Sequence, residues 1–180
     1  YIRDDEKGSL DAAAMLESIR GGNEEGNKER VKRGWAKLEI TGWEQPPRYD
    51  EKTNNLEWAI RAESEGRPVV NFNTRILGRG GVMRVTLVTG PEELAATLPQ
   101  YRAALTNFSY NSGQKYAEYR QGDKLATYGL SALVVGGATA AAVKSGAFKW
   151  LWKFGGIAVL ALLGFAKKLF GRRKTSDLPT

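Results

Sequence analysis

Carboxylates have the clearest potential for acid, base or metal chemistry in this sequence, because histidine and cysteine are both absent from its 180 residues. That absence excludes Ser-His-Asp and Cys-His catalysis, histidine-based zinc sites and disulfides within the chain. Asp4, Asp5 and Glu6, or Glu24 with Glu25, could bind a hard cation through their oxygens. Neither group has the alternating oxygen spacing of a calcium loop. We therefore predict solvated surface charge, no cofactor and no enzymatic activity.

A glycine-rich stretch, GRGG at residues 78–81, could be taken for a loop that cradles phosphate. It joins two predicted strands, however, and no helix N-terminus follows it to complete an anion site. The stretch therefore predicts a hairpin turn.

Aromatic and arginine side chains could together make a sheet face for sugars, peptidoglycan or single-stranded nucleic acid. The set consists of Trp35, Trp43, Tyr49, Trp58 and Phe72 with Arg48, Arg61 and Arg75. The simpler interpretation, which we favour, is that Trp43, Trp58 and Phe72 are core and that the arginines lie on the wet face.

The elements that would position these residues follow from the hydrophobic pattern. Apolar residues at helical spacing predict a helix from about residue 9 to residue 33, with Gly34 as its stop. Alternating residues predict four strands at 38–44, 56–62, 70–76 and 82–88, the first ended by Pro46 and Pro47. A second helix follows at 91–106, with Pro99 as a possible break. The predicted fold is α+β, a four-stranded antiparallel sheet with two helices on one face.

Two uncharged runs follow this body. Residues 125–143 would make about 28 Å of helix, enough to cross a bilayer. Residues 154–166 lie between Lys153 and Lys167 and suit a second span or an interfacial helix. We therefore predict an extramembrane domain at 1–123, the C-terminal part of a longer ectodomain, then a membrane region at 124–170 and a basic tail at 171–180.

Small residues recur along the first hydrophobic run at Gly129, Ala132, Gly136, Gly137 and Ala140. Small surfaces let helix backbones approach closely, so the pattern predicts helix association. The partner would be another copy, giving a homo-oligomer, or the second hydrophobic segment folding back. An oligomeric channel or transport accessory protein is the alternative function.

The basic residues are concentrated near the C-terminus. The net charge is +7, yet residues 1–143 hold 19 basic and 19 acidic side chains. The excess includes Lys167, Lys168, Arg172, Arg173 and Lys174, which predict contact with anionic lipid headgroups rather than nucleic acid. With one membrane crossing the basic tail is cytoplasmic and the body external; with two, both are cytoplasmic.

Several phrases together resemble the DUF2167 family: ITGWEQPPRYD at 40–50, NLEWAIRAESEG at 55–66, NFNTRILGRGGVM at 71–83, and the Asn111, Gly113 and Tyr116 pattern before the Gly/Ala-rich run. The resemblance implies a membrane-anchored bacterial protein of unknown function, with a signal peptide and a longer N-terminal portion. It supplies no catalytic residues. It favours one crossing, and hence an inner-membrane protein with a periplasmic binding or scaffolding body. A carboxylate-based hydrolase completed by a missing N-terminal portion is a further alternative.

Overall fold

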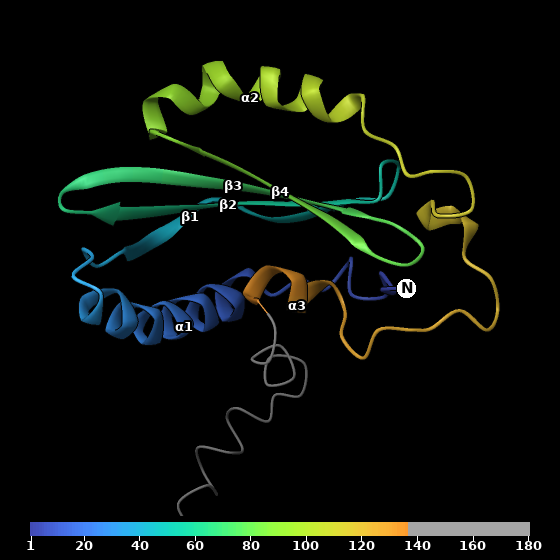
Figure 1. The fold of residues 1–180 in the computed structure, drawn as a ribbon, viewed down its shortest axis with the longest axis horizontal. Helices are drawn as coiled ribbons and strands as arrows, with labels where there is room; N and C mark the ends of the chain where they lie inside the picture. Colours follow the sequence, from blue (N-terminus) through green and yellow to red (C-terminus); the bar gives the residue numbers. More distant parts are fainter. Residues whose placement is uncertain (137–180) are drawn as a thin grey trace, which may run out of the picture. The chain divides into compact units, whose positions relative to one another are not determined.

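Four strands joined by short connections form one antiparallel sheet in the order β1-β2-β3-β4, and helices cover both of its faces (Figure 1). The structure is a computed structural model that describes residues 1–136. The elements are α1 (Ala12–Lys32), β1 (Glu39–Asp50), β2 (Asn55–Ser64), β3 (Arg67–Leu77), β4 (Val82–Thr89), α2 (Pro91–Thr106), the 3₁₀ turn η1 (Tyr116–Glu118) and α3 (Leu130–Val135). The predicted α+β class and the four-stranded antiparallel sheet are confirmed.

Helix α1 is capped at both of its ends. The Asp11 carboxylate accepts a hydrogen bond from the amide of Ala14 at 3.0 Å, which satisfies one of the free donors at the helix start. At the other end Gly34 adopts a φ of 72°, and the amide of Trp35 bonds back to the carbonyl of Arg30 at 2.8 Å. This is the Schellman arrangement that glycine favours. The predicted stop at Gly34 is confirmed.

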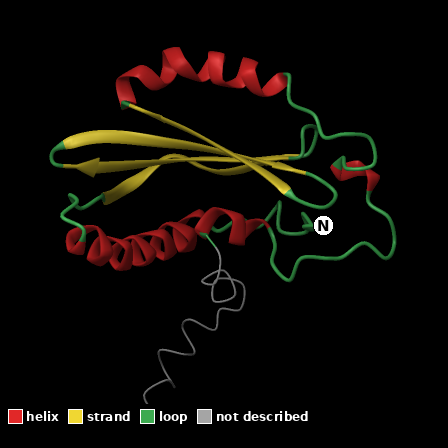
Figure 2. Ribbon diagram, viewed as in Figure 1, coloured by secondary structure: helices red, strands yellow, loops and turns green. Residues whose placement is uncertain are grey.

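The two long helices lie on opposite faces of the sheet, so the prediction that both share one face was wrong (Figure 2). The cause is the two-residue turn between β2 and β3, in which Ser64 pairs with Arg67. That register sets Trp58 beside Asn73 and Ala59 beside Phe72. The apolar residues of β2 and β3 therefore point to opposite faces, and each face needs a helix to cover it.

Helix α1 also protects the edge strand β1. The side-chain amides of Asn23 and Asn27 donate to the carbonyl of Leu38 at 2.6 and 2.7 Å, and the amide of Leu38 donates to Asn27 Oδ1 at 2.9 Å. Arg20 donates to the carbonyls of Ile40 and Thr41 in β1, at 3.3 and 3.1 Å. These bonds satisfy backbone groups that an uncovered sheet edge would leave open to pairing.

Strand β1 runs through Pro46 and Pro47, where the sequence predicted its end. A proline is tolerated here because β1 is an edge strand with register shifts on both sides of Gln45, so these residues need not donate to the ladder. A further shift beside Gly42 places Trp43 opposite Ile60. The bulge explains why Trp43 is out of phase in the sequence yet faces the α1 core.

Helix α2 continues through Pro99, which is exposed, so the expected break is absent. It covers β3 and β4 with Leu94, Leu98 and Tyr101, all only half-buried, over Phe72. Met83 on β4 keeps 39% of its surface exposed.

The first hydrophobic run begins inside the body. Residues 125–129 are not helical, α3 starts at Leu130, and Leu130 and Val134 are buried in the core that contains Met15 and Trp58. The described body therefore extends past the boundary expected at residue 123. A hydropathy count does not show this, because it does not say which distant residues bury an apolar run. No helix within residues 1–136 has the length and apolar character to cross a membrane.

Candidate functional site

Three of the small residues predicted to associate between helices, Gly129, Ala132 and Gly136, lie within the part of the chain that the structure describes. Ala132 is buried, Gly129 is buried at the start of α3, and Gly136 ends that helix with a φ of 80°. Gly137 and Ala140 lie outside the described residues, as do the basic residues Lys167, Lys168, Arg172, Arg173 and Lys174.

Glu6 caps helix α3 from the far end of the sequence. Its Oε2 accepts hydrogen bonds from the amide and the hydroxyl of Ser131, at 2.9 and 2.7 Å. A Cβ atom on Gly129 would lie 2.5 Å from Glu6 Oε1, so a larger residue there would displace this carboxylate. Glu6 is thus an exception to the solvated surface charge predicted for the acidic clusters; Asp5 and Glu25 form exposed ion pairs instead. Within residues 1–136 no three acidic side chains lie close enough together to hold a metal ion.

Two tyrosines of the connector, residues 107–129 between α2 and α3, are hydrogen-bonded to distant parts of the body. The Tyr110 hydroxyl donates to the carbonyl of Ile76 at 2.9 Å and accepts from the amide of Met83 at 2.7 Å, with its ring against Gly78. The buried Tyr116 hydroxyl donates to the carbonyl of Ile2 at 2.9 Å. These bonds tie Tyr110 to strands β3 and β4 and Tyr116 to the N-terminal segment.

The GRGG stretch is the predicted hairpin turn, closed by a bond from the amide of Gly78 to the carbonyl of Gly81 at 2.9 Å. Arg79 extends from it to hold both oxygens of Asp123, with Nε at 2.7 Å and Nη2 at 2.6 Å. This guanidinium is the main reason that the pKa of Asp123 falls to about 2. The pair ties the β3–β4 turn to the connector.

The aromatic set separates as predicted, with one important exception among the arginines. Trp58 and Phe72 are buried and Trp43 is half-buried. Arg48 and Arg61 are exposed, and Arg61 pairs with Glu44. Arg75, however, is only 5% exposed, so its expected place on a wet face was wrong.

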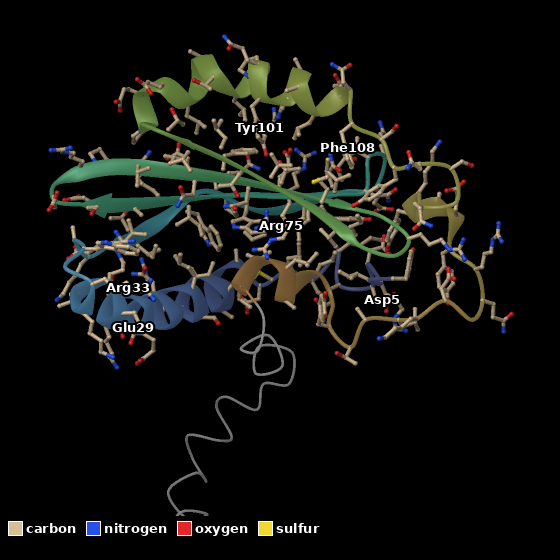
Figure 3. The ribbon with its side chains drawn as sticks, in the orientation of Figure 1. Asp5, Glu29, Arg33, Arg75, Tyr101 and Phe108 are labelled. Carbon is tan, nitrogen blue, oxygen red and sulfur yellow. The ribbon has the colours of Figure 1, made fainter. Side chains whose placement is uncertain are left out.

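Arg75 lies between the sheet and the layer of α1 and α3 (Figure 3). Its guanidinium carbon sits 4.7 Å from the centre of the Trp58 ring, and Nη1 donates to the carbonyls of Thr74 at 3.1 Å and Val85 at 3.4 Å. Burial, and then the charge of Arg84, lower the pKa of Arg75 from its ordinary value. No carboxylate within residues 1–136 forms an ion pair with Arg75.

Comparison with protein families decides the affiliation. A family described as protein of unknown function, DUF2167, matches residues 1–167. The chain belongs to the DUF2167 family. No curated protein and no solved structure matches it. The resemblance drawn from residues 40–50, 55–66 and 71–83 is therefore confirmed, and it assigns no activity.

A second unusual surface of this DUF2167 chain lies at the end of α1. Trp35 is 55% exposed and Val31 is 53% exposed. The guanidinium carbons of Arg33 and Arg30 lie 5.4 and 6.0 Å from the centre of the Trp35 ring. Large apolar side chains ringed by cations suit the boundary between water and lipid headgroups. The sequence pattern does not single out this tip, because Trp35 lies beyond the last residue of α1, Lys32.

Proposed function

We propose that this DUF2167 protein is a non-enzymatic binding or scaffolding protein of the bacterial inner membrane, with its α+β body in the periplasm and a C-terminal membrane anchor. The side-chain types in the sequence support the non-enzymatic part of this proposal. With neither histidine nor cysteine, the chain has few groups suited to acid–base or nucleophilic catalysis near neutral pH. Binding through arginine and aromatic side chains is the simpler use of its surface.

The observation that carries the membrane part of the proposal is the exposed tip formed by Trp35, Val31, Arg30 and Arg33. Tryptophan prefers the headgroup region, and arginine gains from nearby anionic lipid. The tip belongs to the end of α1, and α1 packs against α3 on one side of the sheet (Figure 1). Because the tip and α3 belong to the same layer of helices, their arrangement supports a body that presents its α1 layer to a membrane surface.

The sequence supports an anchor after residue 136. Residues 154–166 are uncharged. Five basic residues follow them: Lys167, Lys168, Arg172, Arg173 and Lys174. Self-association through the predicted small-residue surface would depend on Gly136 and the residues after it, because Gly129 and Ala132 are already buried within the body. The proposal does not require a pore.

Topology is the first property to test, because the chain has no native cysteine to interfere. We would introduce single cysteines at Lys52, an exposed position in the β1–β2 turn, and at Ser176 in the basic tail. Asn54 is less suitable because it has a φ of 55° and donates to the Tyr49 hydroxyl. Each variant is treated with a membrane-impermeant thiol reagent in intact and in permeabilised spheroplasts.

We expect the Lys52→Cys protein to react in intact spheroplasts and the Ser176→Cys protein to react only after permeabilisation. If neither reacts until the membrane is opened, the body is cytoplasmic and the periplasmic function is abandoned. Reconstitution into liposomes then separates a scaffold from a channel, since a scaffold leaves an ion gradient intact and a channel dissipates it.

A further inference from the structure

Arg75 is a buried cation whose charge is not matched by an anion of the described protein. A buried guanidinium with only neutral partners keeps most of the cost of leaving water, because carbonyl groups satisfy its hydrogens without cancelling its charge. Here the neutral partners are two carbonyls, the Trp58 ring and, at 3.5 Å, Asn73 Oδ1. Each of these orients the guanidinium, and none neutralises it.

A second arginine lies directly across the sheet from Arg75. In the β3–β4 ladder Arg75 pairs with Arg84, so both side chains emerge on the same face. Like charges that face each other across strands destabilise a sheet unless something compensates them. Arg84 is exposed and forms no ion pair within residues 1–136. Beyond residue 136 the sequence offers a single acidic side chain, Asp177.

The polar residues around Arg75 and Arg84 position these side chains but carry no negative charge. Asn73 Oδ1 accepts from the Thr86 hydroxyl at 3.0 Å and from Arg75 Nη2, while the Asn73 amide donates to the carbonyl of Asn71 at 3.0 Å. The Thr86 proton is therefore already used. The hydrogen bonds of Arg75 within residues 1–136 come from Nη1 and Nη2, and none is donated by Nε. The same edge of a guanidinium, Nε with Nη2, binds a carboxylate in the Arg79–Asp123 pair.

We propose that Arg75 and Arg84 form a binding site for a phosphate group on the α1 side of strands β3 and β4. Arg75 supplies a buried guanidinium edge held by its neighbours, and Arg84 on the paired strand supplies a second, solvent-exposed cation on the same face. Charge-assisted bonds from two arginines are the usual means of holding a phosphate group. Because the site consists of groups within the body, it does not depend on the side of the membrane on which the body lies.

The test is the thermal stability of the full chain in phosphatidylcholine nanodiscs, in chloride and in inorganic phosphate at equal ionic strength. At about ten times the dissociation constant, bound phosphate should raise the Tm by about 3–5 °C. In the Arg84→Gln protein the rise should fall below about 1 °C, by the same relation. Arg75→Lys, which keeps the charge but loses the planar edge, should also lose most of it. Arg67→Gln, an exposed arginine of the same strand, is the matched control and should retain the full rise.

A second arm identifies the source of the phosphate group. Nanodiscs in which part of the phosphatidylcholine is replaced by phosphatidic acid present the group on a lipid instead of in solution. A Tm rise with free phosphate, lost in both site variants, supports a soluble ligand; a rise only with phosphatidic acid, lost in the same variants, supports a lipid headgroup. The site is refuted if neither raises the Tm, if both site variants keep the rise, or if Arg67→Gln loses it as well.

Discussion

Gly129 lies against the carboxylate of Glu6, so close that a methyl group on Gly129 would approach Oε1 to 2.5 Å. The two residues come from opposite ends of the described chain. Their contact places the Glu6 carboxylate where it accepts from the amide and hydroxyl of Ser131 at the start of α3. Through this contact the N-terminal segment fixes the helix with which the described chain ends.

Gly129→Ala should therefore displace Glu6 and cost about 1 kcal/mol in the free energy of unfolding, the usual value of a lost helix cap. In a Glu6→Ala background the same substitution should cost much less, because the cap is already gone. Urea unfolding of the four proteins of this cycle measures the coupling. Gly8→Ala is the control, since no atom lies near its Cβ position. Equal costs in both backgrounds would contradict the proposed contact.

The Arg79–Asp123 pair should make stability depend on pH in the acid range. Because the folded-state pKa of Asp123 is lowered from 3.8 to about 2, its contribution is complete above about pH 4 and disappears as the pH falls toward 2. The difference in Tm between the native protein and Asp123→Asn should shrink over that interval. Thermal scans from pH 6 to pH 2 measure it, with Asp5→Asn as an exposed control. A difference that does not change with pH would exclude the pair as its origin.

Tyr116→Phe should lower the free energy of unfolding by about 1 kcal/mol, because the buried hydroxyl is lost and the carbonyl of Ile2 keeps no partner for that bond. Tyr119→Phe is the matched control. Its ring also contacts Tyr1, but its side chain is 40% exposed. Urea unfolding should separate the two substitutions clearly. Similar small effects would mean that the N-terminal segment is not held through Tyr116.

The two methionines of the chain should respond very differently to truncation. Met15 on α1 is fully buried against the sheet, so Met15→Ala should cost about 2–5 kcal/mol. Met83 on β4 keeps 39% of its surface exposed, and Met83→Ala should change stability by less than about 0.5 kcal/mol. Chemical denaturation of both proteins checks the order. A reversed order would mean that α1 does not cover this face.

The Trp35 tip should enter the lipid headgroup region if the body lies against a membrane. A Trp35→Cys protein carrying an environment-sensitive fluorophore should show a blue-shifted emission in nanodiscs that contain phosphatidylglycerol. The same label on Thr53→Cys, in the exposed β1–β2 turn, should report water. Identical emission from both sites would remove the membrane-facing role of α1 while leaving the anchor untouched.

The sequence by itself determined the local elements. Gly34 marks the end of α1, alternation locates the four strands, and the GRGG stretch forms a turn because it joins two of them. These features depend on neighbouring residues, so they can be read without knowing the fold. Even the opposite placement of α1 and α2 was available in principle, because a two-residue turn at Glu65 and Gly66 pairs even-numbered positions of β2 with odd-numbered positions of β3.

Only the tertiary structure decided the roles that depend on distant partners. Hydropathy treats Leu130 and Val134 as the beginning of a membrane span, yet Met15 and Trp58 bury them in the body. Alternation assigns Arg75 to a solvated face, yet its register beside Arg84 and its packing on Trp58 make it a buried, unneutralised cation. Burial and charge balance are sums over groups that the chain brings together from far apart, and no local pattern contains those sums.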